Sequence, residues 1–209
     1  METDWDALIL NKVKSLVSLG GTIVDVGAHV GNYSANFAGI VGDQGRVISF
    51  ELNPDNFAQL QKKLGHQKNI TLKNVAVSDK SGFEKYYSNS LCHSFGTNII
   101  GYDVNHKKGD LLGSIKSVRL DEVIDMPVRF MKIDVEGAEI KVLRGAEKII
   151  NNIQYLIIEC HFPDQWEELR KLVIDYKLNC MNLVTGEVIT LASPRPYQMF
   201  CKNNNFVFK

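Results

Sequence analysis

The sequence lacks long hydrophobic runs and an excess of charge of either sign. No apolar stretch of its 209 residues approaches the roughly 18 residues that a membrane-spanning helix needs. Its 24 Lys and Arg balance its 24 Asp and Glu, whereas a nucleic-acid-binding domain usually carries a basic excess. The segment Met1–Asp4 is acidic and lacks the basic start of a signal peptide. We therefore predict a cytoplasmic protein with no membrane span and no nucleic-acid partner.

Cysteine is also scarce, and its spacing excludes the common paired motifs. The chain has four cysteines and no CxxC pair. Two of the four fall inside apolar, strand-like runs, which favours buried free thiols in a reducing compartment over disulfides. The cysteines are Cys92, Cys160, Cys180 and Cys201.

What is present is an alternation of strand-like and helix-like segments, which predicts a parallel α/β sheet. No repeat or linker divides residues 1–209, so we predict one domain. An opening helix over Asp4–Leu19 has Thr3 as its cap, and Asn53-Pro54 begins another helix. Further helices are predicted at Asn32–Val41, Ala138–Ile150 and Asp164–Tyr176. Strands are predicted at Thr22–Val26, Arg46–Glu51, Ile70–Val77, Val128–Asp134, Gln154–Cys160, Cys180–Val184 and Phe206–Phe208.

Residues 81–127 interrupt this alternation and form a predicted insertion. Phe83–Tyr87 and Ser117–Leu120 are strand-like, and the polar stretch Asn89–Gly113 lies between them. Long polar loops inside a compact domain are usually functional or disordered. We therefore expect this stretch to influence which substrate is accepted.

Two strands end in glycine and acidic residues, as buried strands do where they leave a sheet beside a ligand crevice. In the first, Asp25-Val-Gly27-Ala28-His29-Val-Gly31 leads into a helix that starts with Asn32 and Tyr33. Glycine lets the backbone approach a ligand, and a helix start offers free N–H groups to an anionic end. Asp25 would either accept a hydrogen bond from the ligand or hold the turn. The alternative for the whole motif is a structural turn.

The following strands supply the remaining parts of a nucleotide-like site. Glu51 ends the second strand, where an acid can accept hydrogen bonds from both ribose hydroxyls, with Leu52 beside it. The alternative is a solvated charge at a strand end. Small residues near the end of the third strand, Ala76 and Val77, suit an adenine ring.

The other strand that ends in acidic residues leads into Lys132-Ile-Asp134-Val-Glu136-Gly-Ala-Glu139. We call these two acidic strand ends the first and second acidic exits. Glu159 and His161 end the next strand, and neighbouring parallel strands lie about 5 Å apart, so Asp134, Glu159 and His161 are expected to converge. As alternatives, Asp134 only positions the cofactor amine, and His161 is an ordinary turn residue. Lys132 is expected in an internal ion pair, for which we consider Asp121, and Glu139 at a helix N-terminus.

These motifs resemble, in order, those of the FkbM family of methyltransferases. The resemblance runs from about Thr22 to His161 and is most specific at Lys132–Glu139; it departs at His29, where the family more often has Asn. It implies S-adenosylmethionine as cofactor and the Rossmann-like class I methyltransferase fold, a seven-stranded, mostly parallel sheet with helices on both faces. The start of the chain close to the first helix suggests a minimal member or a domain of a larger protein.

The resemblance implies O-methylation of a hydroxyl on a sugar or glycan. A lipid or small natural product as acceptor, or a non-catalytic cofactor-binding module, are the alternatives. A sugar hydroxyl needs a base or a metal at neutral pH, and we expect His161 as the base. Asp134 and Glu159 are predicted as ligands of Mg²⁺, a hard cation that prefers oxygen. The motifs of nucleic-acid amino and cytosine C5 methylation are absent from the sequence.

Overall fold

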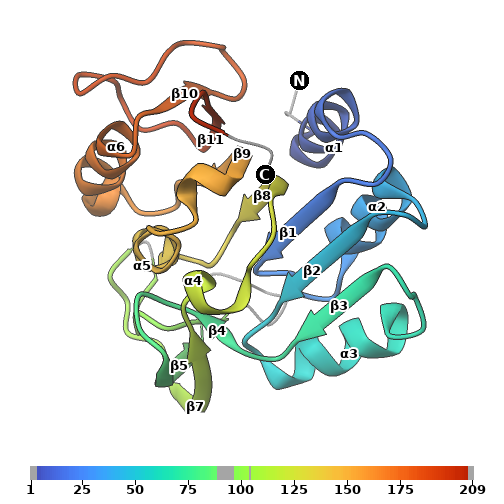
Figure 1. Cartoon of the computed structure of the whole chain (residues 1–209). Coiled ribbons are helices and arrows are strands. Elements are labelled where there is room, and N and C mark those ends of the chain that lie inside the picture. The colour runs from blue at the N-terminus through green and yellow to red at the C-terminus, as the bar shows by residue number, and fades with distance from the viewer. Residues whose placement is uncertain (1–3, 89–96, 104, 207–209) are drawn as a thin grey trace.

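The computed structural model describes residues 4–88, 97–103 and 105–206, and its centre is a seven-stranded sheet (Figure 1). The strand order is β10-β11-β9-β8-β1-β2-β3, and the pairs from β9 to β3 are parallel. Only the β9–β11 and β10–β11 pairs are antiparallel. The predicted fold, a mostly parallel class I methyltransferase sheet, is confirmed. The strands are β1 (Thr22–Val26), β2 (Arg46–Phe50), β3 (Ile70–Lys73), β8 (Val128–Ile133), β9 (Ile153–Glu159), β10 (Leu178–Asn182) and β11 (Gln198–Asn203).

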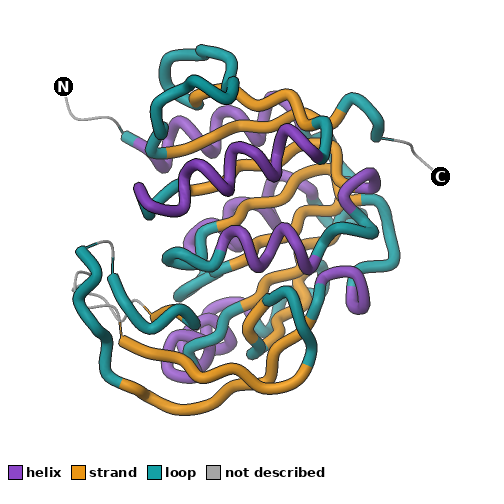
Figure 2. The backbone as a smooth tube through the Cα atoms, turned by 90° about the vertical axis from the view of Figure 1, so that its left-hand side faces the viewer, coloured by secondary structure: helices purple, strands orange, loops and turns teal. Residues whose placement is uncertain are grey.

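Helices cover both faces of this sheet (Figures 1 and 2). Side chains alternate across each strand, so Ile23 of β1 packs in one core with Ile9 and Phe37, and its neighbour Val24 packs in another with Val142. Burial on both faces explains why the central strands are almost wholly apolar. The first face carries α1 (Trp5–Leu16), α2 (Asn32–Val41) and α3 (Pro54–Leu64), and the second carries α5 (Glu139–Gly145) and α6 (Trp166–Asp175).

The predicted insertion forms most of a second, four-stranded sheet, which lies at the lower end of both views (Figures 1 and 2). The predicted single strand Ile70–Val77 is wrong, because its last two residues belong to this second sheet. The side-chain amide of Asn74 donates to the carbonyls of Glu51 and Leu52, which holds the chain where it leaves β3. The order is β4 (Ala76–Val77), β7 (Leu111–Val118), β5 (Gly82–Ser88) and β6 (Thr97–Asn98), and the short helix α4 (Leu120–Val123) follows β7.

Two predicted helices are shorter in the structure. The first helix begins at Trp5 and ends at Leu16, and its cap is Asp4, whose carboxylate accepts the N–H of Ala7. The predicted cap, Thr3, lies outside the described residues. The helix predicted over Ala138–Ile150 ends at Gly145, and a 3₁₀ turn follows at Ile150–Asn152.

Several predicted boundaries of strands and helices also differ from the structure. Of the expected final strand, Phe206–Phe208, only Phe206 lies within the described residues, and it is beyond β11 and outside any strand. The strand predicted at Ser117–Leu120 is the end of the longer β7, because Leu120 already begins α4. The helix predicted from Asp164 begins with a 3₁₀ turn at Pro163–Gln165.

The expectation of free thiols is wrong for two of the cysteines. Cys180 and Cys201 are direct partners across the antiparallel β10–β11 pair, with Cα atoms 4.0 Å apart, and they form a disulfide. Sequence spacing could not reveal this because strand register brings the two residues together. Cys160 is buried and free, and Cys92 lies outside the described residues.

Within the described ranges, no helix combines the length and the apolar character that crossing a membrane requires.

Candidate active site

A cavity of about 260 Å³ opens where β1, β2 and β8 end. Its wall is made of the two acidic exits predicted from the sequence, together with residues of the insertion and of α1. Polar groups lie among apolar walls at this edge of a parallel sheet, which is the usual place for a ligand in such folds. Nine of the eleven residues predicted for the cofactor line it: Gly27, Ala28, His29, Asn32, Tyr33, Glu51, Leu52, Ala76 and Val77.

The glycine turn after β1 is required by the close approach of β8. Gly27 has φ +87°, and a Cβ at this position would lie 1.7 Å from the carbonyl oxygen of Asp134. Gly31 has φ +85° and caps α2, and a Cβ there would lie 2.5 Å from Cδ1 of Leu60. Gly31 is therefore not part of the cavity wall, but it allows α2 and α3 to pack together.

Asp25 also lies behind the cavity wall. It is fully buried, and its Oδ2 accepts a 2.6 Å hydrogen bond from the hydroxyl of Ser34. Burial raises its pKa, and the nearby charge of Lys132 opposes this shift. Among the described residues its Oδ1 has no hydrogen-bond partner. Of the two roles predicted for Asp25, this geometry favours support of the turn.

Glu51 lies in the cavity wall and is only 5% exposed. Its Oε2 accepts the N–H of His29 at 2.7 Å, and its Oε1 accepts the N–H of Asn53 at 2.8 Å. Burial raises the pKa of Glu51, and these two N–H groups oppose that shift. The side chain of Asn56 also bonds Glu51. A carboxylate has about four acceptor positions, so Glu51 can still accept a hydrogen bond from a ligand.

The wall near Glu51 is otherwise mainly apolar. Val75 and Ile99 complete the surface made by Leu52, Ala76 and Val77. Ile99 and its neighbour Thr97 come from the insertion, and the sequence analysis did not identify them. No local pattern could have done so, since the fold of the second sheet brings them to the cavity.

Lys132 and Asp134 form a buried ion pair at the other exit. The Nζ atom of Lys132, which is 1% exposed, lies 2.7 Å from Oδ2 of Asp134 and 4.6 Å from the ring centre of Tyr33. Burial alone would raise the pKa of Asp134, but Lys132 and His161 hold it below its usual range. The suggested partner of Lys132, Asp121, is wrong, because Asp121 pairs with Arg119 at 2.7 Å.

The predicted convergence of Asp134, Glu159 and His161 is observed. The Nε2 atom of His161 lies 3.2 Å from Oδ1 of Asp134 and 3.1 Å from Oε2 of Glu159. Burial lowers the pKa of His161, but the hydrogen bonds to these carboxylates raise it to about 11. The imidazole is therefore protonated at neutral pH, and must lose that proton before it can act as the predicted base.

The donors proposed for Mg²⁺ do not fit a dication. Both oxygens of Asp134 are engaged, one by the Lys132 ammonium and one by His161. Both oxygens of Glu159 are engaged as well, by Gln198 at 2.9 Å and by His161. Asp134, Glu136 and His161 have potential ligand atoms within 4.8 Å of one another, but the Asp134 carboxylate of this group is already paired with the Lys132 ammonium. A positive charge 2.7 Å from a ligand carboxylate opposes binding of a second cation.

Glu139 begins α5, as the sequence suggested, but it is buried and 2% exposed. Its Oε1 accepts the N–H groups of Gly137 at 3.1 Å and Val135 at 3.4 Å. Burial raises its pKa to about 7. Its main contacts are therefore with the backbone of the second exit.

Comparison with known proteins agrees with this geometry. Residues 25–180 match the family described as the methyltransferase FkbM domain. A curated relative, hexuronic acid methyltransferase AglP of Haloferax volcanii, is 24% identical over 160 residues. That match covers 74% of this chain and 62% of the relative, so the chain spans less than two thirds of the relative's length.

Three solved structures share the fold. A protein of Clostridium thermocellum, described as an rRNA methylase, has a TM-score of 0.60 and 14% identity, covering 96% of this chain and 95% of that one. Methyltransferase FkbM of Methylobacillus flagellatus has a TM-score of 0.58 and 18% identity, covering 90% and 45%. A methyltransferase of Streptococcus mutans, solved with S-adenosylhomocysteine, has a TM-score of 0.54 and 10% identity, covering 97% and 99%.

Proposed function

The chain belongs to the FkbM family of methyltransferases, and from that premise we propose that it methylates a hydroxyl of a sugar or glycan with S-adenosylmethionine. The observation that carries the proposal is the position of the Asp134–His161–Glu159 cluster. It adjoins the cavity that contains Glu51, so a titratable imidazole held by two carboxylates lies beside the candidate cofactor site.

The cavity residues fit the cofactor. Glu51 retains acceptor capacity for the ribose, and the apolar surface of Leu52, Ala76 and Val77 suits the adenine ring. The N-terminal turn of α2, with Asn32 and Tyr33, faces the same cavity. The S. mutans neighbour with its bound product cofactor supports this assignment.

S-adenosylmethionine supplies an electrophilic methyl group on a positively charged sulfur. The residues of this chain must align the acceptor hydroxyl with that group and remove its proton. Asp134 holds the hydroxyl at the end of β8. The positive charge of a cofactor in the cavity would lower the pKa of His161, because like charges disfavour the imidazolium. Neutral His161 would then accept the proton of the acceptor hydroxyl, and Glu159 would stabilise the imidazolium that forms.

A sugar acceptor is supported by the archaeal relative, which is named for a hexuronic acid. Nucleic acid is the main competitor, because the fold is shared with a protein described as an rRNA methylase. The equal numbers of basic and acidic residues favour a small acceptor over a polyanion.

The first test is calorimetric titration with S-adenosylhomocysteine, followed by transfer of a labelled methyl group to a panel of sugars, glycans, lipids and RNA. We expect micromolar binding and transfer to a sugar, with equal rates in EDTA and in Mg²⁺, since the acids are engaged by Lys132 and His161. Folded protein that does not bind the nucleoside would contradict the cofactor assignment. Transfer only to lipid or RNA would contradict the sugar assignment.

Variants separate catalysis from cofactor binding. His161→Ala and Glu159→Ala should lower the turnover number at least tenfold, in line with the loss of a general base, with S-adenosylhomocysteine affinity unchanged. Glu122→Ala is a matched control, because Glu122 lies on α4 and contacts Ser81 instead of the cavity. If the unaltered protein binds S-adenosylhomocysteine tightly but methylates no acceptor, it is a non-catalytic module.

A further inference from the structure

The cavity wall also includes Asp6 of α1, which is far in sequence from the strand exits. The hydroxyl of Tyr33 donates to Oδ1 of Asp6 at 2.5 Å, and the ring of Tyr33 lies under the ammonium of Lys132. The first turn of α1 is thereby connected through Tyr33 and Lys132 to the carboxylate of Asp134.

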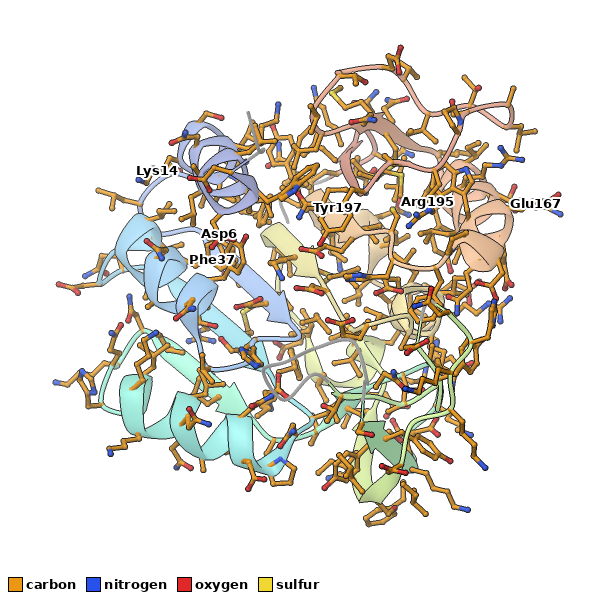
Figure 3. The ribbon with its side chains drawn as sticks, turned by 180° about the vertical axis from the view of Figure 1, so that it is seen from behind. Asp6, Lys14, Phe37, Glu167, Arg195 and Tyr197 are labelled. Carbon is orange, nitrogen blue, oxygen red and sulfur yellow. A yellow bond between two sulfur atoms is a disulfide. The ribbon has the colours of Figure 1, made fainter. Side chains whose placement is uncertain are left out.

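An exposed aromatic ring is fixed beside the same residues. Tyr197 is 46% exposed, and its ring centre lies 4.7 Å from that of Trp5 and 6.0 Å from that of His161. Burial and the nearby charge of Glu159 raise the pKa of the Tyr197 hydroxyl. Figure 3 shows Asp6 and Tyr197 toward the middle of the molecule, whereas Glu167 lies at its outer edge. An aromatic face held rigid next to reacting groups suits the C–H face of a sugar ring.

Acidic groups outnumber cations around Asp6 and Tyr197. Asp134 and Glu136 line the cavity with Asp6, and Glu159 contacts His161. The cations among these described neighbours are Lys132 and His161, both bonded to Asp134, and Arg195, which donates to the carbonyl of His161 at 2.8 Å. A carboxylate on the acceptor would thus enter a region in which acids outnumber cations, and like charges repel strongly where water is scarce.

We propose that Asp6, Tyr33 and Tyr197, with Trp5 packed against Tyr197, form the acceptor subsite, and that it takes an uncharged sugar ring in preference to a uronate. The ring lies on Tyr197, its hydroxyls bond to Asp6 and Tyr33, and the reacting hydroxyl points to Asp134 and His161. This inference rests on the proposed function, because it names the acceptor of the same site.

Matched sugar pairs test the charge preference without requiring turnover. Methyl glycosides of glucose, galactose and mannose are compared with the corresponding methyl uronosides, which differ at C6 by a carboxylate. Binding is measured by saturation-transfer NMR with S-adenosylhomocysteine present. We expect the neutral member of at least one pair to bind at least tenfold more tightly than its uronate.

Variants test the residues. Tyr197→Ala should weaken neutral sugar binding at least tenfold, whereas Tyr197→Phe keeps the ring and should stay within about threefold. The double variant Asp6→Asn, Glu136→Gln removes two negative charges, and the amide oxygen at position 6 can still accept from Tyr33. The ratio of neutral-sugar affinity to uronate affinity should become smaller in this variant. Phe83→Ala is the control, because Phe83 is an exposed aromatic ring on β5 that is not part of the cavity wall. Affinity for S-adenosylhomocysteine should be the same in the Tyr197 and Phe83 variants, because neither residue is part of the cavity wall.

Three results would overturn the inference. The first is tighter binding of a uronate, and the second is Tyr197→Ala protein that binds neutral sugars normally; both would leave methyl transfer to sugars standing. The third is the absence of binding by every sugar while S-adenosylhomocysteine still binds, which would contradict the proposed sugar acceptor itself.

Discussion

At the scale of single residues, the buried charges of the second exit are stabilised in different ways. The charge of Asp134 is balanced by Lys132 and His161, which lie within hydrogen-bonding distance. Glu139 relies on backbone N–H groups, and burial raises its pKa to about 7. A raised carboxyl pKa means that ionisation costs stability: the cost is absent at low pH and grows as the pH rises from the unfolded value to the folded one.

Glu139→Gln should therefore stabilise the protein in alkaline solution. The amide oxygen of Gln can still accept from Gly137 and Val135, and it carries no charge to bury. We expect a gain of about 1–3 kcal/mol in the free energy of unfolding at pH 8, since one unit of pKa shift is worth about 1.4 kcal/mol, and no gain at pH 4. Urea denaturation of the wild type and the variant at both pH values measures this.

Glu147→Gln provides the comparison for that substitution. Glu147 is exposed, so its replacement should change stability by less than about 0.5 kcal/mol. A Glu139→Gln protein that is less stable than the wild type at pH 8 would show that the charge is needed for folding.

For His161 we predict that the effect on folding stability changes with pH in the opposite direction to that of Glu139. Burial lowers its pKa, but hydrogen bonds to Asp134 and Glu159 raise it from 6.5 to about 11. Its contribution to stability is complete below pH 6.5 and is lost as the pH rises toward 11. The stability difference between wild type and His161→Gln should therefore be largest near pH 6, on the order of a few kcal/mol, and shrink by pH 10. Exposed His66 supplies the control His66→Gln, and an imidazole NMR signal of His161 that titrates near pH 6.5 would contradict the assignment.

At the scale of elements, the distance between the two acidic exits is set by one glycine. The chain leaving β8 passes so close to the turn after β1 that no side chain fits at Gly27. The same turn presents Ala28 and His29 to the cavity. Element packing and cavity shape thus depend on the same backbone position.

Gly27→Ala should destabilise the protein by more than about 3 kcal/mol, because a Cβ cannot fit 1.7 Å from a carbonyl oxygen and φ is +87°. Gly39→Ala makes the same chemical change inside α2 with no atom within 4 Å, and should stabilise by about 0.5–1 kcal/mol. Chemical denaturation of both proteins measures the contrast, and similar stabilities would refute the packing argument.

At the scale of the whole molecule, the C-terminal strands support the active site. β11 carries Gln198, which binds Glu159, and follows Tyr197 directly. The disulfide between Cys180 and Cys201 ties this strand to β10 at the edge of the sheet. The edge is therefore held covalently as well as by backbone pairing.

Replacing both cysteines by Ala should lower the free energy of unfolding by about 2–4 kcal/mol, because the bond closes a loop with a sequence separation of 21 residues. The measurement is thermal unfolding with and without a reducing agent. Reductant should lower the melting temperature of the wild type and leave the double variant unchanged. A wild type that is insensitive to full reduction would argue against the bond.

Much of the fold and part of the site could be predicted from local sequence. β1 and α2 have the predicted bounds because an apolar run and a glycine turn define them locally. Asn53 caps α3 as expected. The break between β3 and β4 was missed because it depends on Asn74 reaching the carbonyls of Glu51 and Leu52. The end of α5 at Gly145 was also missed, and there too a tertiary contact is involved. Gly145 packs so closely against Ser78 that a Cβ would lie 2.1 Å from the Ser78 carbonyl oxygen.

The sequence alone determined the fold class, the family resemblance and the two acidic exits, because these are recorded in short contiguous segments. Only the tertiary structure decided that Lys132 pairs with Asp134, that Asp6 shares the cavity with Asp134, that Tyr197 lies beside His161, and that Cys180 is bonded to Cys201. It also decided the charge of His161, which is set by two carboxylates on neighbouring strand ends. The physical reason is distance: these interactions act over a few ångströms between residues that packing brings together, and their strength depends on burial, which no local pattern records.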